Sequence, residues 1–363
     1  MTQPQNTVDS VMPTEAGHVR RSLLRQALTA RKGGKIGTGG RGAIALRFDD
    51  NAKDFRDKVL PLLVERQLPF TRVTTTKRVG TIGNEMDTWA NIQNYTIKHG
   101  GEVWNHGATH RDATGEEAIH TEIVGALHDM RAKMPRIPID CFAPPGGASI
   151  SYDGHMPSNT VDNWADTYAG RLIYGHHALV SGYFENSFYR PMDGVLRDGQ
   201  THYSVDLYDA GRAKDLIDRA RDWKMGVVMM WHAKNFGADK FMSTADFVAT
   251  LDYLVAQREA GNLLVLTKSG LGVADVTSSA RDDILPQPSG DPYRVKIDYP
   301  QYRQNVPGST RELTATVTGP AGSTVTSRIG ESSATHVIPA TGMLALRHVA
   351  TIPPRCTCAD CFD

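Results

Sequence analysis

Two adjacent aspartates, Asp49 and Asp50, carry the clearest chemical implication in this sequence. They close a segment that opens with the apolar run 42–46, which predicts a buried strand. Carboxylates at the end of a buried strand need a positive partner, because an unpaired buried charge is energetically costly. The pair therefore predicts a cation site at the carboxyl end of this strand.

Two histidines spaced four residues apart, His106 and His110, could give the same ion its nitrogen ligands. Side chains at positions i and i+4 of a helical turn share one face, so we expect a helical turn that presents both imidazoles. Two imidazoles and one carboxylate leave positions for water, as in a catalytic zinc-type site. Taken alone, this spacing is also compatible with chance in a chain of 13 histidines.

A third segment, the apolar run 226–231, ends at His232 and predicts another buried strand. Catalytic residues of α/β barrels lie at this end of the strands. A histidine there could also be structural, with its hydrogen bonds satisfied inside the fold. The order of the three segments along the chain favours one shared site.

Together these segments resemble the polysaccharide deacetylases of the NodB-homology type, carbohydrate esterase family 4. The resemblance spans about residues 42–272 and rests on four motifs, at Arg47-Phe48-Asp49-Asp50, His106 to His110, 143–147 and Met230-Trp231-His232. It implies an α/β fold, a distorted (β/α) barrel with fewer than eight regular units.

The resemblance also implies roles for individual residues. Asp49 would be the general base, His232 the general acid, and Asp50, His106 and His110 the metal ligands. The metal would be divalent, with Zn²⁺ as the first expectation and Co²⁺, Ni²⁺ or Mn²⁺ as alternatives. The reaction would release acetate from a glycan. The oxyanion or substrate would lie near Pro145, Gly146, Arg47, His176, His177 and Trp231.

Two departures from the family pattern concern the base and the acid. Ala143 stands where relatives carry an arginine that pairs with the base. Arg47 and Asp49 share strand parity, so Arg47 is predicted to supply that charge instead. The fourth family motif, an Asp-Trp pair, is not clear. We expect its strand at 171–177, where a histidine either orients His232 or is satisfied structurally.

Strand and helix patterns alternate through this region, which favours a parallel α/β architecture. Helices are predicted at 54–67, 89–98, 116–134, 209–223 and 245–259, and further strands at 68–73, 139–142 and 263–266. The predicted organisation is an attachment helix and Gly-rich linker (1–41), the barrel (42–275), a linker (276–309), a small β domain (310–353) and a Cys-containing tail (354–363).

Composition narrows the possible partners. Net charge is zero and the isoelectric point is about 7.2, which gives no support for nucleic-acid binding. No apolar run approaches the length of a membrane span. Four cysteines form no disulfide framework, and Cys356, Cys358 and Cys361 indicate a tail in preference to a metal or redox site.

The setting is predicted from resemblance together with the lack of an export signal at the start of the sequence. The chain is similar to deacetylase-like minor tail proteins of phages of Gram-positive actinobacteria. We therefore expect a virion tail-tip protein that acts on acetylated cell-envelope polysaccharide at the host surface. The helix 14–31, with Val19, Leu23, Leu24 and Leu28 at helical spacing, would contact other tail proteins or a copy of itself, and a trimer is possible. The alternatives are a glycan-binding tail protein without turnover, and a cellular cell-wall or chitin-type deacetylase whose signal is removed.

Overall fold

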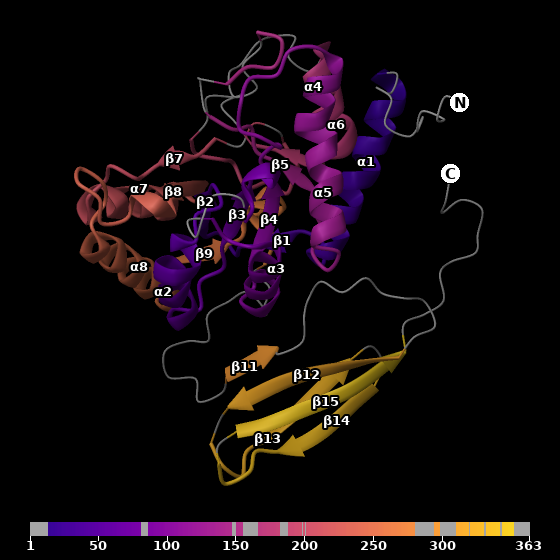
Figure 1. Ribbon diagram of the computed structural model, residues 1–363. Coiled ribbons are helices and arrows are strands. Elements are labelled where there is room, and N and C mark those ends of the chain that lie inside the picture. Colours follow the sequence, from indigo (N-terminus) through magenta and orange to yellow (C-terminus); the bar gives the residue numbers. More distant parts are fainter. Residues whose placement is uncertain are drawn as a thin grey trace. The chain divides into compact units, whose positions relative to one another are not determined.

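The computed structural model divides the chain into two units, Met1–Leu285 and Pro286–Asp363 (Figure 1). The residues it describes are 14–80, 86–146, 150–154, 166–181, 188–197, 199, 201–279, 294–297, 310–318, 320–329, 332–341 and 343–351.

A curled, wholly parallel sheet forms the centre of the first unit, which confirms the α/β class. Its strands follow the order β6-β5-β4-β3-β2-β8-β7, and β9 also pairs with β2. The strands are β2 (Gly42–Asp49), β3 (Thr71–Thr74), β4 (Glu102–Asn105), β5 (Cys141–Phe142), β6 (Leu179–Val180), β7 (Tyr203–Ser204), β8 (Gly226–His232) and β9 (Leu263–Leu266). Among the described residues no backbone pairing joins β6 to β7, so the sheet is an open half-barrel with β2 near its middle.

Helices connect these strands, and several begin at a side-chain cap. Thr88, Thr167, Asp209 and Ser243 each accept a hydrogen bond from a backbone N–H in the first turn that follows. The helices are α2 (Leu60–Glu65), α3 (Trp89–Lys98), α4 (Glu116–His120), α5 (Ala126–Lys133), α6 (Tyr168–His176), α7 (Ala210–Trp223), α8 (Thr244–Glu259) and α9 (Lys268–Gly272). A π-helical turn precedes α2 at Phe55–Val59, and another joins α4 to α5 at Thr121–Gly125.

The strand predicted at 171–177 is wrong, because this segment belongs to helix α6. Its buried positions include Ala169, Leu172, Ile173 and His176, which recur at the helical spacing of three and four residues. The run is short and apolar, a pattern that fits a buried strand or a buried helix equally well. The cap at Thr167 is the local feature that favours the helix.

The N-terminal helix α1 (Thr14–Arg31) packs within the first unit, beside α6 (Figure 1). Leu28 is buried in a cluster with Trp104 and Ala143, whereas Leu23 is 52% exposed. The end of the helix is anchored by charge, since Arg31 pairs with Asp140. The next strand, β1 (Ile36–Gly37), pairs with β10 (Ala274–Asp275). The side chain of Val19 lies outside the described residues.

The second unit consists of antiparallel strands. One sheet has the order β11-β12-β15, and β13 pairs with β14. Their bounds are β11 (Arg294–Ile297), β12 (Thr310–Thr318), β13 (Thr324–Ile329), β14 (Ser332–Val337) and β15 (Met343–Thr351). Strand β11 lies in the range predicted to be linker. The cysteines at 356, 358 and 361 lie outside the described residues. No helix in the described part of the chain is long and apolar enough to span a membrane.

Candidate active site

The ends of strands β2 and β8 bring the predicted base and acid together. Asp49 and His232 are register partners on these parallel strands, so both leave the sheet at one level. Strand alternation sends Phe48 and Trp231 to the opposite face, where their rings stack in the core with centroids 5.5 Å apart. The structure therefore does not bring Trp231 to the site, and Met230 lines the pocket instead.

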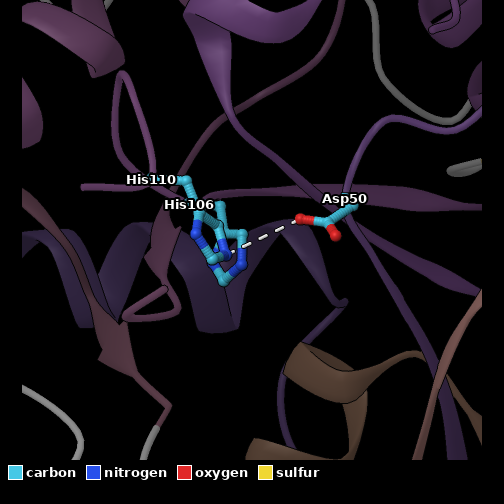
Figure 2. Close-up of side chains that lie close together, drawn as sticks. All are labelled: Asp50, His106 and His110. Atoms are coloured by element: carbon cyan, nitrogen blue, oxygen red, sulfur yellow. Dashed lines mark ion pairs between the residues drawn. The ribbon is translucent and has the colours of Figure 1, made fainter. Parts of the chain in front are cut away.

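Asp50 turns away from the strand direction of Asp49, because its φ of 62° lies in the left-handed region. Its Oδ1 atom is buried and has no hydrogen-bond partner among the described residues. The Nε2 atom of His110 lies 3.7 Å from that oxygen (Figure 2). A buried carboxylate oxygen without a donor is what a bound cation would satisfy.

His106 and His110 lie in a loop after β4, not in the helical turn that their spacing predicted. Left-handed φ angles at Gly107 (81°) and His110 (62°) break any helix there. The loop is held by Glu122, whose carboxylate accepts the backbone N–H groups of Ala108 and Thr109. The two imidazole centroids are nevertheless 5.2 Å apart.

The donor atoms of Asp50, His106 and His110 all lie within 4.8 Å of one another. His106 Nδ1 donates to the carbonyl oxygen of Ala143 at 2.6 Å, which leaves Nε2 as its ligand atom. Burial lowers the pKa of His106 to about 4 and also lowers the pKa of His110, so both imidazoles stay neutral as metal binding requires. One carboxylate and two neutral imidazoles suit a divalent metal of the zinc type.

Arg47 supplies the charge that Ala143 cannot. Its Nε and Nη2 atoms donate to Oδ1 and Oδ2 of Asp49, each at 2.5 Å. Burial alone would raise the pKa of Asp49, but the charges of Arg47, His106 and His232 hold it well below its usual range. Asp49 is therefore a buried carboxylate, fixed in orientation by a bidentate pair.

Asp206 is a site residue that sequence reasoning missed. Its Oδ2 atom lies 2.5 Å from His232 Nδ1, and its Oδ1 accepts the His232 backbone N–H at 2.8 Å. Burial lowers the pKa of His232, but the hydrogen bond to Asp206 and the charge of Asp49 raise it above its usual value overall. The strand before Asp206 has only two residues, too few to show a periodic pattern. Asp206 is followed by Leu207, so it does not form the Asp-Trp pair of the family motif.

His176 and His177 do not line the pocket. His176 Nδ1 lies 3.3 Å from Arg20 Nη2, and His177 Nδ1 lies 3.1 Å from the carbonyl oxygen of Ile173. His202 lines the pocket instead, and the sequence did not indicate it.

The pocket around these residues has a volume of about 470 Å³. Gly146 lines it with a φ of 72°, and a side chain there would collide with Ile150. Pro144 lines it rather than the predicted Pro145, and Gly147 lies outside the described residues. Arg78 and Lys234 stand near Asp50, with Lys234 Nζ 3.5 Å from Oδ2.

Residues 36–157 match the polysaccharide deacetylase family. The polysaccharide deacetylase match contains Asp49, Asp50 and both loop histidines, and it ends before Asp206 and His232. The family match therefore does not cover the acid half of the site. No curated protein matches the chain significantly.

Several solved structures are similar to this chain at low identity. A family 4 acetyl xylan esterase from Clostridium thermocellum, in complex with a cobalt ion, has 17% identity and a TM-score of 0.40, covering 68% of this chain and all of that one (100%). The Bc1960 peptidoglycan N-acetylglucosamine deacetylase has 16% identity and a TM-score of 0.39, covering 68% and 94%. A mutant of the peptidoglycan deacetylase PdaC from Bacillus subtilis has 16% identity and a TM-score of 0.38, covering 64% and 91%.

Proposed function

We propose that this chain is a metal-dependent hydrolase that removes acetyl groups from a polysaccharide. The observation that carries the proposal is the donor cluster of Asp50, His106 and His110 beside a fixed carboxylate and an Asp-paired histidine. The family match at residues 36–157 supports the same chemistry.

A divalent metal held by the three ligands would polarise the acetyl carbonyl and make an attacking water more acidic. Asp49 takes the proton of that water. Both of its oxygens accept from Arg47, but each carboxylate oxygen keeps further acceptor capacity. The backbone of Gly146, on the pocket wall, is the proposed site for the developing oxyanion.

His232 protonates the departing amine or alcohol. Because Asp206 holds the Nδ1 side, the proton is delivered from Nε2. The raised pKa of His232 keeps the imidazole protonated nearer to neutral pH, as a general acid requires. The products are acetate and a sugar with a free amine or hydroxyl group.

A glycan-binding protein without turnover is the second candidate. The observation that favours it is the bidentate salt bridge from Arg47 to Asp49, which lowers the basicity of the Asp49 carboxylate. Acetate release from acetylated envelope glycans, measured for the metal-loaded wild type and for Asp49→Asn, separates the two candidates. Release that Asp49→Asn abolishes supports hydrolysis, whereas glycan and metal binding without any acetate supports the binding protein.

We further propose that the hydrolase works on a phage tail tip, on acetylated polysaccharide of the host envelope. The support for this setting is the resemblance of three segments, 37–42, 104–110 and 143–146, to deacetylase-like phage tail proteins. Mass spectrometry of purified virions tests it, and absence of the chain from infectious particles would leave the cellular deacetylase as the better setting.

A further inference from the structure

The guanidinium of Arg47 reaches both edges of the open sheet. Ser181 directly follows edge strand β6, and His202 directly precedes the opposite edge strand β7. Arg47 Nη1 donates to Ser181 Oγ at 2.9 Å and lies 3.1 Å from His202 Nδ1. A single guanidinium nitrogen on central strand β2 thus contacts residues beside both edge strands, β6 and β7. No strand pairing joins these two edges in the described part of the chain, although the backbone N–H of Gly199 donates to the Val180 carbonyl oxygen at 3.0 Å.

The other side of the same guanidinium holds Asp49 through Nε and Nη2. A guanidinium is planar and its five N–H groups have fixed directions. When Nη1 is fixed by Ser181 and His202, the edge that faces Asp49 is fixed as well. The orientation of the Asp49 carboxylate therefore depends on Ser181 and His202, which act on it through the guanidinium of Arg47.

A buried lysine, Lys268, contacts the same serine that Arg47 contacts. The Nζ atom of Lys268 hydrogen-bonds Ser181 Oγ, and it lies 4.7 Å from the ring centroid of Trp104. Lys268 is fully buried, as are Arg47 and Ser181. Buried charged groups are weak contributors to stability compared with apolar groups of similar size. A contact needed only to hold the strands together would not require two buried basic side chains, and burial and the charge of Arg47 lower the pKa of Lys268 well below its usual value.

The tautomer of His202 follows from its partner. Arginine can only donate, so His202 Nδ1 must accept and the ring proton must lie on Nε2. The ring is therefore neutral. Burial and the charge of Arg47 lower the pKa of His202 well below its usual value, which agrees with that state.

We propose that Ser181, His202 and Lys268 are positioning residues that act on Asp49 through Arg47. The contacts that Arg47 makes with both edges of the sheet then also orient the base. This inference rests on the proposed function, in which Asp49 is the base.

Ser181→Ala and Lys268→Met test the first branch of the network. We expect each to lower kcat by roughly ten- to a hundredfold, with KM and metal affinity unchanged, since small misplacements of a reacting group have effects of that order. In an Arg47→Lys background, which lacks the planar fork, Ser181→Ala should have no further effect on kcat. Ser269→Ala is the matched control: it removes a buried hydroxyl bonded to Glu102 and should leave kcat unchanged.

The second branch is tested at His202, where the acceptor can be kept or removed. His202→Asn keeps an acceptor oxygen near the position of Nδ1 and should retain most of kcat, whereas His202→Leu should lose it. If His202 contributed to folding alone, both variants would have a lower melting temperature, and their kcat values would not differ from each other in this way. Full kcat in Ser181→Ala and in His202→Leu, or effects that add to that of Arg47→Lys, would overturn the proposal.

A measurement without turnover separates this inference from the proposed function. Nitrogen-15 NMR of the wild type should show His202 as the Nε2–H tautomer, and its Nδ1 signal should shift in Arg47→Lys. If the wild type releases no acetate, the proposed function fails, whatever this spectrum shows. An Nδ1–H tautomer overturns the Arg47 network, whatever the activity.

Discussion

The carboxylate of Asp206 accepts two hydrogen bonds from His232, one from its backbone N–H and one from Nδ1 of its imidazole. The backbone bond places the aspartate, and the imidazole bond orients the ring. The same contact raises the pKa of His232, because a negative partner favours the protonated form.

Asp206→Asn should therefore lower the pKa of His232. The protonated acid form would be lost at a lower pH, so the alkaline limb of the kcat/KM profile should move to lower pH. At pH 8 we expect kcat to fall by roughly tenfold or more, as for the loss of a general acid. An unchanged alkaline limb in this variant would show that another group sets it.

Metal binding should depend on Asp50 and not on Asp49. Asp50→Ala removes a ligand and should reduce the zinc content of the purified protein to near zero, measured by elemental analysis. Asp49→Asn, the neighbouring change, should retain the metal while acetate release disappears. A chelator should remove activity from the wild type, and added zinc should restore it. Equal metal loss in both variants would contradict the division of roles between the two aspartates.

Arg47→Ala leaves the buried Asp49 without its counter-charge. We expect the free energy of unfolding to fall by about 3–5 kcal/mol, measured by urea titration. Arg197 and Asp193 form a similar bidentate pair at the surface, with side chains 35% and 41% exposed. Arg197→Ala should cost less than about 1 kcal/mol, because an exposed pair is solvated.

Guanidinium ion at low concentration should partly restore the activity of Arg47→Ala, since Arg47 lines the pocket. Recovery of acetate release, without recovery of the urea midpoint, would separate the effect on Asp49 from the effect on folding. No recovery at any non-denaturing concentration would count against the role of Arg47.

Lys32 should make the stability of the fold depend on pH. Its Nζ atom lies 3.1 Å from Glu102 Oε2, and Glu102 is buried in β4. Burial would raise the pKa of Glu102, but Lys32 and the hydrogen bonds from Ser269 lower it overall. A lowered folded pKa contributes stability above the unfolded value, near 4.5, and that stability is lost as pH falls below it.

Lys32→Met should therefore reduce stability at pH 7 more than at pH 3, measured by urea titration at both. Lys77→Met is the matched control, because Lys77 pairs with Asp129 at the surface with side chains 59% and 43% exposed. Its effect should be small at both pH values. A loss for Lys32→Met that is equal at the two pH values would exclude the charge pairing as its cause.

The sequence predicted those parts of the site that lie at the ends of long, patterned strands. Asp49 and His232 could be recognised because β2 and β8, strands of eight and seven residues, each begin with an apolar run. The parity of Arg47 and Asp49 predicted their pairing for the same reason. His106 and His110 were found by spacing, although the helical turn inferred from that spacing is absent.

The residues that sequence reasoning missed belong to the shortest strands. Ser181, His202 and Asp206 flank β6 and β7, which have two residues each and therefore no periodic pattern. Their position in the site depends on the curl of the sheet, a long-range property. The segment 171–177 failed for a different reason. Its apolar run could be seen in the sequence, but a short apolar run does not distinguish a buried helix from a buried strand.

The packing of α1 sets the smallest fragment that can be expected to fold. The family match begins at Ile36, after this helix has ended. A truncation at that point would remove Leu28 and Lys32, leaving Trp104 uncovered and the Glu102 carboxylate without its ammonium partner. Expression trials guided by family boundaries alone would thus begin about twenty residues too late, and an inactive product would say nothing about the chemistry of the pocket.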